Sequence, residues 1–252
     1  MALDIPTISY DSIPQARRDE DFFIETITFK VEDTIFRVPR MGFLDPECFF
    51  AGMFDLPGPG PNGEQAQGTT DESPIVLEGE SKAHFKAFLK ALYPALYCSL
   101  PETGKPYRAS ITRKIDVDSY DEWVGVLHLS TKWGFSETRK TAIENISRFT
   151  KTDVWDKILL AKKYNVRKWL LEGYKVLVNS RAPQDVDQLV ENMGVADALK
   201  LLQIREKSLT SLADYLENDS RGFYSPPSRQ RLNPETLILE SFSYEFASME
   251  DA

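Results

Sequence analysis

The stretch "FKVEDTIFRVPRMGF", residues 29–43, decides how the fold begins. Apolar residues recur at every second position on both sides of the polar residues 32–34, which is typical of two half-buried strands joined by a tight turn. The apolar face is expected to hold Ile27, Phe29, Val31, Phe36 and Val38, and the opposite face Thr26, Thr28 and Lys30. Pro39 lacks an N–H donor and has a fixed φ, so it should end the second strand and suit a first helical turn.

Downstream of the hairpin, the pattern predicts a short helix and then a loop. Asp45 is the expected N-cap and Pro46 the first helical residue of a very apolar helix that runs to Phe54. Residues 55–74 hold Gly, Pro, Gln and Thr with almost no large apolar side chain, which predicts a flexible loop insertion. Residues 75–77 should form a short buried strand.

The clearest helix of the sequence follows Ser81, its expected N-cap, and ends before Pro94. Its apolar residues recur at helical spacing, namely Phe85, Phe88, Leu89, Leu92 and Tyr93. Residues 95–118 lose this pattern and predict a second loop insertion. Helices are expected at 120–132, with Trp123, Val126 and Leu127 inward, and at 136–149, separated by a break at Gly134.

After residue 150 the sequence predicts four more helices. Their expected ranges are 153–164, with Asp153 as a cap; 166–178; 185–193, between Pro183 and Gly194; and 196–216. In the second, the inward face should hold Val166, Trp169, Leu170, Gly173, Tyr174 and Leu177. In the fourth it should hold Leu199, Leu202, Leu209, Leu212 and Leu216.

The C-terminal tail from residue 218 begins as a polar linker, yet residues 235–246 are amphipathic. Leu237, Leu239, Phe242 and Phe246 are its apolar residues. Two interpretations remain: the segment folds back on its own helical domain, or it is a short linear motif for a partner.

Composition narrows the class of protein. With 252 residues and 42% hydrophobic content, the chain can bury one large core or two modest ones. Its formal charge of −9 and sequence pI near 4.9 argue against a nucleic-acid-binding surface. Two cysteines, Cys48 and Cys98, are too few for a disulfide framework and suit reduced, buried thiols. Neither a signal peptide nor a membrane-spanning run is expected, so the interpretation is a cytoplasmic or nuclear protein without membrane contact.

The sequence contains no recognisable motif for catalysis, metal binding or phosphate binding. Cys48, His84, Cys98 and His128 are isolated, whereas a zinc site needs about four ligands at short spacing. The Gly-rich "LPGPGPNG" lacks the Lys-Ser/Thr of a phosphate-binding loop, and no G-x-S-x-G elbow is present. We therefore expect no catalytic residue, no metal and no cofactor.

Several spaced residues resemble the opening signature of the BTB (POZ) fold, in which a hairpin leads into short helices. They are Val31, Phe36, Val38, Arg40, Phe43, Phe50, Met53 and Phe54, and by residue type alone they predict core packing. "PIVLEGESKAHFKAFLKALYP" resembles the following strand and helix, and "EWVGVLHLSTKWGFSETRKTAIENI" the closing helical hairpin. The wording "FRVPR" and the long loops are similar to BTB proteins of fungi, with Pro39 where many animal members have histidine.

The resemblance implies an α+β chain: a BTB/POZ fold, with a small β-sheet flanked by helical hairpins, and then an all-α extension. The implied parts are a flexible arm at 1–20, the BTB domain at 21–150, a helical extension similar to BACK at 151–217 and a partly disordered tail at 218–252.

The same resemblance implies a non-enzymatic protein–protein interaction module that forms a homodimer and acts as a scaffold or as a substrate adaptor for a cullin-type ubiquitin ligase. The family's cullin-contact motif, an apolar residue, any residue and Glu, matches Leu100, Pro101 and Glu102. The alternative from another class is a carboxylate-dependent hydrolase, for which no motif was found. Any role on nucleic acid would be indirect, through a partner.

Overall fold

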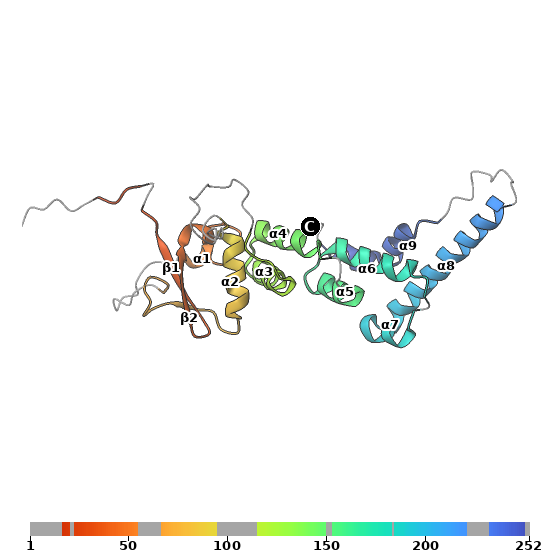
Figure 1. The fold of residues 1–252 in the computed structure, drawn as a ribbon, viewed down its shortest axis with the longest axis horizontal. Coiled ribbons are helices and arrows are strands. Elements are labelled where there is room, and N and C mark those ends of the chain that lie inside the picture. Colours follow the sequence, from red (N-terminus) through yellow and green to blue (C-terminus); the bar gives the residue numbers. More distant parts are fainter. Residues whose placement is uncertain are drawn as a thin grey trace, which may run out of the picture. The chain divides into compact units, whose positions relative to one another are not determined.

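The computed structural model describes residues 17–20, 23–54, 67–94, 115–149, 153–182, 184–220 and 232–249, without the side chains of Phe54 and 214–220. Over these residues the fold is α+β, as expected, with a three-stranded sheet and a series of helices (Figure 1). The chain divides into two compact units, Met1–Phe85 and Lys86–Ala252. This division falls within helix α2 (Lys82–Leu92), whereas the sequence suggested a boundary near residue 150.

The sheet of the first unit has β1 (Thr26–Val31) at its centre. It pairs antiparallel with β2 (Thr34–Pro39) and parallel with β3 (Ile75–Val76), in the order β2-β1-β3. Val31 pairs with Thr34, so a two-residue turn closes the hairpin, and its first residue, Glu32, has a φ of 53°. The hairpin prediction is confirmed, and β2 ends at Pro39 as expected.

Phe29 is the centre of the core in this unit. Its ring lies 4.9 Å from that of Phe43, 5.6 Å from that of Phe50 and 5.5 Å from that of Phe85 on α2. Ile27 and Val31 are buried on the same face of the strand. The predicted alternation therefore identifies the face of the sheet that packs against Phe43, Phe50 and Phe85.

Thr28 departs from the prediction, because it is fully buried although it lies on the polar face. Its N–H donates to the carbonyl of Gly68 at 2.8 Å, and the Arg37 guanidinium lies 3.4 Å from its hydroxyl. Residues 67–74, which the sequence analysis assigned to a flexible loop, thus form turns held to β1. Gly68 has a φ of +85°, and a Cβ there would lie 2.9 Å from Ile75 Cδ1, so a larger residue would be strained and would displace the Ile75 side chain.

The hairpin turn also holds the beginning of α2. Glu32 Oε1 accepts from the Lys82 N–H at 3.3 Å, and Asp33 Oδ1 accepts from Lys82 Nζ at 2.9 Å. The ammonium of Lys82, followed by the hydroxyl of Thr34, lowers the pKa of Asp33. The helix begins directly after Ser81, as predicted, but a carboxylate from the turn serves its first N–H group.

The predicted helix over 45–54 is wrong for most of its length. A 3-10 helix η1 (Arg40–Phe43) follows the strand, and the α-helix α1 covers Ala51–Phe54 alone. Asp45 accepts from the Glu47 N–H at 3.0 Å, so it caps a turn instead of a helix. Cys48 and Phe50 are both buried, and two residues two positions apart cannot both face the core from one α-helix.

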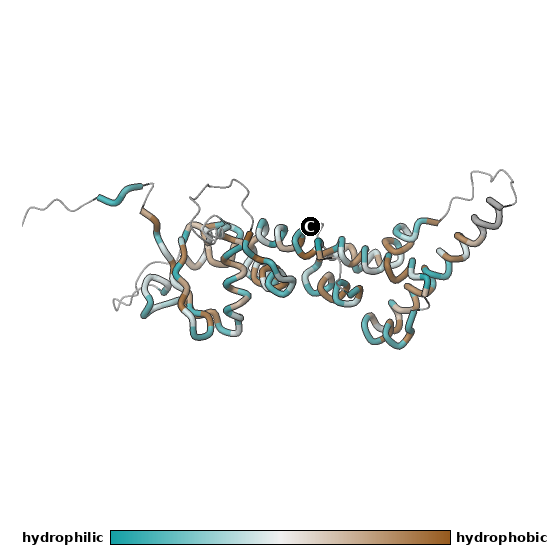
Figure 2. The backbone as a smooth tube through the Cα atoms, in the orientation of Figure 1, coloured by the Kyte–Doolittle hydropathy of each residue, from teal (hydrophilic) through white to brown (hydrophobic). Residues whose placement is uncertain are grey.

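The second unit is built from paired helices, and its helices match the predicted ones closely. After α2 the helices are α3 (Tyr120–Trp133), α4 (Ser136–Ile146), α5 (Val154–Lys163), α6 (Arg167–Asn179), α7 (Val186–Met193), α8 (Val195–Ser220), α9 (Pro234–Ser241) and α10 (Ser243–Ala247). Hydrophobic and hydrophilic stretches alternate along them (Figure 2). Asp153 and Asp185 cap α5 and α7, and Gly134 ends α3 with a φ of 77°.

The predicted inward face is confirmed for α6. For α8 it is wrong in part, since Leu202 packs against the core as predicted but Leu199 and Leu209 do not. In α8, Leu199 is 55% exposed and Leu209 is 45% exposed, whereas Ala198, Leu201 and Ile204 are buried. The side chain of Leu216 lies outside the described residues. Leucine occurs on both sides of α8, and its packing against α6 and α9 determines which side is buried.

The tail folds back on the helices of its own unit, which confirms the first interpretation. Helix α9 packs against α6 and α8, and Ile238, Phe242 and Phe246 are buried in the core there. Leu237 and Leu239 are partly buried against the same core.

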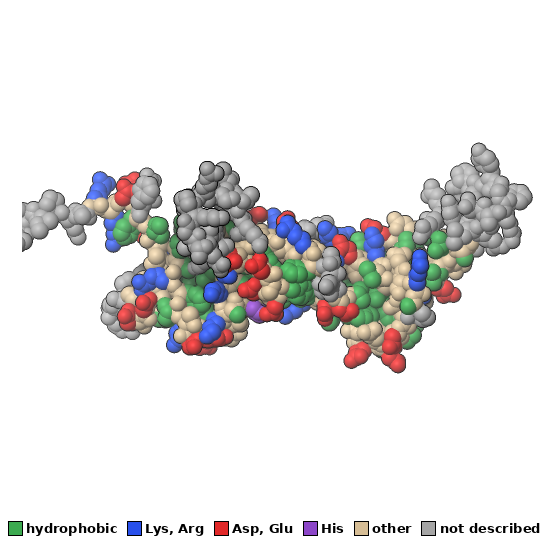
Figure 3. Space-filling view, in the orientation of Figure 1, with side chains coloured by type: hydrophobic (Ala, Val, Ile, Leu, Met, Phe, Trp, Pro, Cys, Tyr) green, Lys and Arg blue, Asp and Glu red, His purple; other side chains and the backbone are tan. Residues whose placement is uncertain are grey.

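Acidic side chains lie at α7 and at its N-cap, in keeping with the negative charge of the chain (Figure 3). Asp185, Asp187 and Glu191 are exposed there, together with Val186 and Gln188. Over the described ranges, each helix is too short or too polar to span a membrane.

Candidate functional site

The titratable residues that the sequence analysis considered are dispersed. Cys48 is a buried free thiol whose Sγ contacts the carbonyl of Phe43 at 3.3 Å, and Cys98 lies outside the described residues. His84 and His128 are half-buried, and the His128 ring lies 6.4 Å from that of Tyr164. In the part of the chain that the structure describes, no three His, Cys, Asp or Glu side chains are grouped so as to hold a metal ion. The absence of a metal site stays a prediction.

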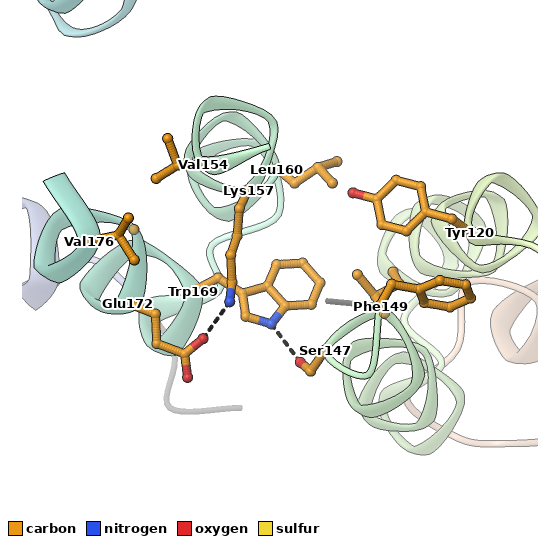
Figure 4. A pocket seen from close by; sticks show the side chains of 11 residues that line it. Tyr120, Ser147, Phe149, Val154, Lys157, Leu160, Trp169, Glu172 and Val176 are labelled. Atoms are coloured by element: carbon orange, nitrogen blue, oxygen red, sulfur yellow. Dashed lines mark hydrogen bonds and ion pairs between the residues drawn. The ribbon is translucent and has the colours of Figure 1, made fainter. Parts of the chain in front are cut away.

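A cavity of about 340 Å³ lies beside Trp169 in the second unit (Figure 4). Figure 4 shows Trp169 in the middle of the lining, with Lys157 and Glu172 on one side and Phe149 and Tyr120 on the other. The lining residues come from α3, the end of α4, α5 and α6: Tyr120, Ile146, Ser147, Phe149, Val154, Lys157, Leu160, Trp169, Glu172, Gly173 and Val176. The volume lies within the range of small-molecule or side-chain pockets.

A hydrogen-bond chain fixes the indole that forms the wall of this cavity. Trp169 Nε1 donates to Ser147 Oγ at 2.7 Å, and Ser147 Oγ donates to the Ile143 carbonyl at 2.7 Å. These bonds tie α6 to the last turn of α4. The partners of Ser147 are an indole and a carbonyl, and neither is a base that would activate the hydroxyl for attack.

One ion pair provides the charge at the cavity. Lys157 Nζ of α5 and Glu172 Oε2 of α6 lie 2.5 Å apart, and both side chains are partly exposed. The pair balances the two charges, and the rest of the lining is mostly aromatic and aliphatic, with the hydroxyls of Tyr120 and Ser147. The chemistry that this arrangement supports is the binding of an apolar group.

Gly173 gives the cavity its shape on the α6 side. A Cβ at this position would lie 2.5 Å from Ile158 Cγ1, so the two helices approach more closely than a larger residue allows. A second cavity of about 290 Å³ shares Tyr120 and Leu160 with the first and adds Asp121, Asp156 and Lys163.

A different kind of site lies in the first unit, where three large apolar side chains are exposed on one short segment. Met41 is 73% exposed, Leu44 51% and Phe49 69%. We call these three residues the 41–49 surface. Their buried neighbours hold the segment in place, because the rings of Phe43 and Phe50 lie 5.2 Å apart in the core.

The eight residues of the predicted signature are mostly structural. Val31, Val38, Phe43 and Phe50 are buried. Phe36 is half-buried, with its ring 5.1 Å from that of Phe85, and Met53 is half-buried. Arg40 Nη1 forms an ion pair with Glu25 at 3.1 Å. Phe54 ends α1, and its side chain is not described, while Leu100, Pro101 and Glu102 lie outside the described residues.

Sequence reasoning missed the cavity and the 41–49 surface. The signal for the cavity was a glycine, Gly173, four residues after Trp169 on a buried helical stripe. The pairing of Lys157 with Glu172 had no signal, because it joins two helices. Phe49 was assigned to an apolar helix, and only the turn that replaces this helix directs it outward.

Comparison with known proteins adds no relative: no protein-family model matches the chain, and no curated protein sequence matches it.

Proposed function

We propose that the chain is a non-enzymatic protein–protein interaction module of the BTB/POZ type, which self-associates through the 41–49 surface. The order of its elements supports this proposal. A β-hairpin is followed by the short helices η1 and α1, by the parallel strand β3, by α2 and by the α3–α4 pair. The sequence resemblance implies the same order.

The observation that carries the proposal is the exposure of Met41, Leu44 and Phe49. Complete burial of a fully exposed large apolar side chain is worth about 1.5–3 kcal/mol, and the exposed fractions of 51–73% reduce this contribution in proportion. A two-fold interface uses the same patch on both copies, so each side chain contributes twice. Because Phe43 and Phe50 already anchor the segment, little ordering is required on association.

Light scattering and sedimentation of the purified chain test the proposal. Wild-type protein at high micromolar concentration should have the mass of a dimer, and Phe49→Glu or Met41→Glu should give a monomer. Tyr244→Glu, which changes an aromatic side chain that is 93% exposed on α10, is the control and should keep the dimer. A monomeric wild type, or a dimer that survives both charged substitutions, would refute self-association through this surface.

We also propose the adaptor role, with a cullin as one partner and Leu100, Pro101 and Glu102 as its contact. The resemblance of this motif supports the assignment. A pull-down with a cullin N-terminal domain should lose capture in Glu102→Ala and keep it in Glu217→Ala, a control elsewhere in the chain. Equal capture by wild type and Glu102→Ala would remove the assigned contact.

A further inference from the structure

The tail segment, residues 232–249, contacts α6 mainly through two aromatic residues. The ring of Tyr174 on α6 lies 4.7 Å from that of Phe242 and 6.3 Å from that of Phe246. Ile238, one helical turn before Phe242, is fully buried. The tail therefore presents apolar residues at i, i+4 and i+8 to its own unit, which is the spacing of an amphipathic segment that lies in a groove.

Ion pairs flank this apolar stripe. In each pair the carboxylate belongs to the tail and the cation belongs to a helix of the second unit. Glu235 pairs with Lys175 at 2.7 Å, and Glu245 pairs with Lys162 at 3.0 Å. Tyr174 Oη donates to Glu245 Oε2 at 2.9 Å.

Two more cations face the aromatic rings of the tail. The Arg167 guanidinium lies 5.8 Å from the centre of the Phe246 ring, and Lys200 Nζ lies 5.4 Å from the centre of the Phe242 ring. Cations at this distance are attracted to the face of a ring. We call the helical side chains that meet the tail, Lys162, Arg167, Tyr174, Lys175 and Lys200, the receptor surface.

The tail contains its own folding signals. Asn233 caps α9 by accepting from the Glu235 N–H at 3.0 Å, and Pro234 occupies the first turn. Its partners on the receptor surface are distant in sequence: 60 residues separate Lys175 from Glu235, and 71 separate Tyr174 from Glu245. The segment is thus a capped, acidic, amphipathic unit that reaches the receptor surface from far along the chain.

From this complementarity we infer that the receptor surface binds acidic, helix-forming segments, and that the chain's own tail is the occupant which an acidic segment of a partner protein displaces. The partner segment carries large apolar residues at i, i+4 and i+8, with carboxylates at i−3 and i+7, the positions of Glu235 and Glu245. This interaction is separate from self-association through the 41–49 surface.

The tether gives the tail an advantage over any free competitor. A short linker raises the effective concentration of a joined segment to roughly the millimolar range. A free peptide at about 10 μM therefore competes at a disadvantage of roughly 100-fold in the intact chain. Cutting the linker removes this advantage without removing the tail, so the folded complex can be tested directly.

The experiment uses the full chain with a protease site introduced between residues 221 and 231, cut after folding. A fluorescently labelled peptide of residues 232–249 is added to the cut and to the intact protein, and its binding is followed by anisotropy. At about 10 μM the labelled peptide should exchange into the cut protein, whereas it should occupy only about 1% of the intact protein, because the tethered tail outcompetes it roughly 100-fold. Raising the salt concentration should weaken binding, since the ion pairs are partly exposed.

Two peptide variants separate a specific docking from a general hydrophobic one. The double variant Glu235→Lys and Glu245→Lys places two cations against Lys175 and Lys162 and should lose binding at least tenfold. Tyr244→Ser removes a side chain that is 93% exposed and should bind as the parent does. The inference is overturned if the cut protein unfolds or admits no labelled peptide, or if the Lys variant binds as well as the parent.

Discussion

Replacement of Gly173 by alanine tests how closely α5 and α6 approach each other. The new Cβ would lie 2.5 Å from Ile158 Cγ1 and 3.1 Å from Ile158 Cδ1. Ile158 is fully buried, so its side chain has no solvent to move into. Gly173→Ala should therefore force either a rotamer change or a shift of the helices.

The expected cost follows from two opposing effects. Overpacking of a core costs about 1–3 kcal/mol, while alanine is favoured over glycine in a helix by about 1 kcal/mol. Because Cγ1 is next to the branch point of Ile158 and moves less than the end of the side chain, we expect a net loss of about 1–2 kcal/mol. For a unit of this size the loss lowers Tm by about 2–8 °C.

Urea unfolding followed by tryptophan fluorescence measures the stability of the second unit, which contains Gly173. The four tryptophans, Trp123, Trp133, Trp155 and Trp169, all belong to the second unit. Gly52→Ala in α1 is the matched control, read by circular dichroism, because nothing lies within 4 Å of a Cβ there. This control should be neutral or slightly stabilising.

A double-mutant cycle with Ile158→Ala shows whether the contact is the cause. Ile158→Ala alone should cost about 2–5 kcal/mol by leaving a cavity. In the double variant the methyl group added by Gly173→Ala has room, so the combined cost should be at least about 1 kcal/mol smaller than the sum of the two. Additive effects, or a Gly173→Ala variant as stable as wild type, would refute the close approach of these helices.

Three further predictions concern other contacts. Gly68→Ala combines a positive φ with a clash against Ile75 and should cost about 2–4 kcal/mol in thermal unfolding. Arg205 Nη2 donates to the carbonyls of Ser180 and Ala182, at 2.7 and 2.8 Å, so Arg205→Met should cost about 1–3 kcal/mol in urea unfolding, unlike a substitution at exposed Lys207. Lys82 lowers the folded-state pKa of Asp33, so the stabilisation is present above the ordinary aspartate pKa and is lost as pH falls through the lower, folded-state value. An Asp33→Asn variant should lack this acid-dependent loss in unfolding curves measured across the acidic range, and an unchanged loss would contradict the assignment.

Local signals in the sequence predicted the hairpin and most helices, because those signals act over a few residues. The alternation around Phe29, the caps Asp153 and Asp185 and the break at Gly134 each depend on neighbours along the chain. The inward face of α6 was also predictable, since one side of that helix carries nearly all its large apolar residues.

The failures share one physical origin, which is competition from distant contacts. Leu199 and Leu201 are equally apolar, and the packing of α8 on α6 and α9 buries only Leu201. Thr28 is buried by residues about 40 positions later in the chain. The segment around Cys48 forms turns because the core of the first unit takes both Cys48 and Phe50. The residues that line the cavity come from different helices, so the pattern within any one helix could not predict their contact.

The contacts of Glu32 and Asp33 in the hairpin turn with Lys82 at the start of α2 affect the order of folding. Asp33 and Lys82 are separated by 49 residues, and the parallel pairing of Phe29 with Ile75 spans a similar distance. The hairpin alone can form in about 1–10 μs. Its completion requires closure of a long loop, which slows folding when contacts are non-local. During synthesis β1 is made before β3 and α2. Until β3 is made, the edge of β1 that pairs with it is exposed and can pair with other chains.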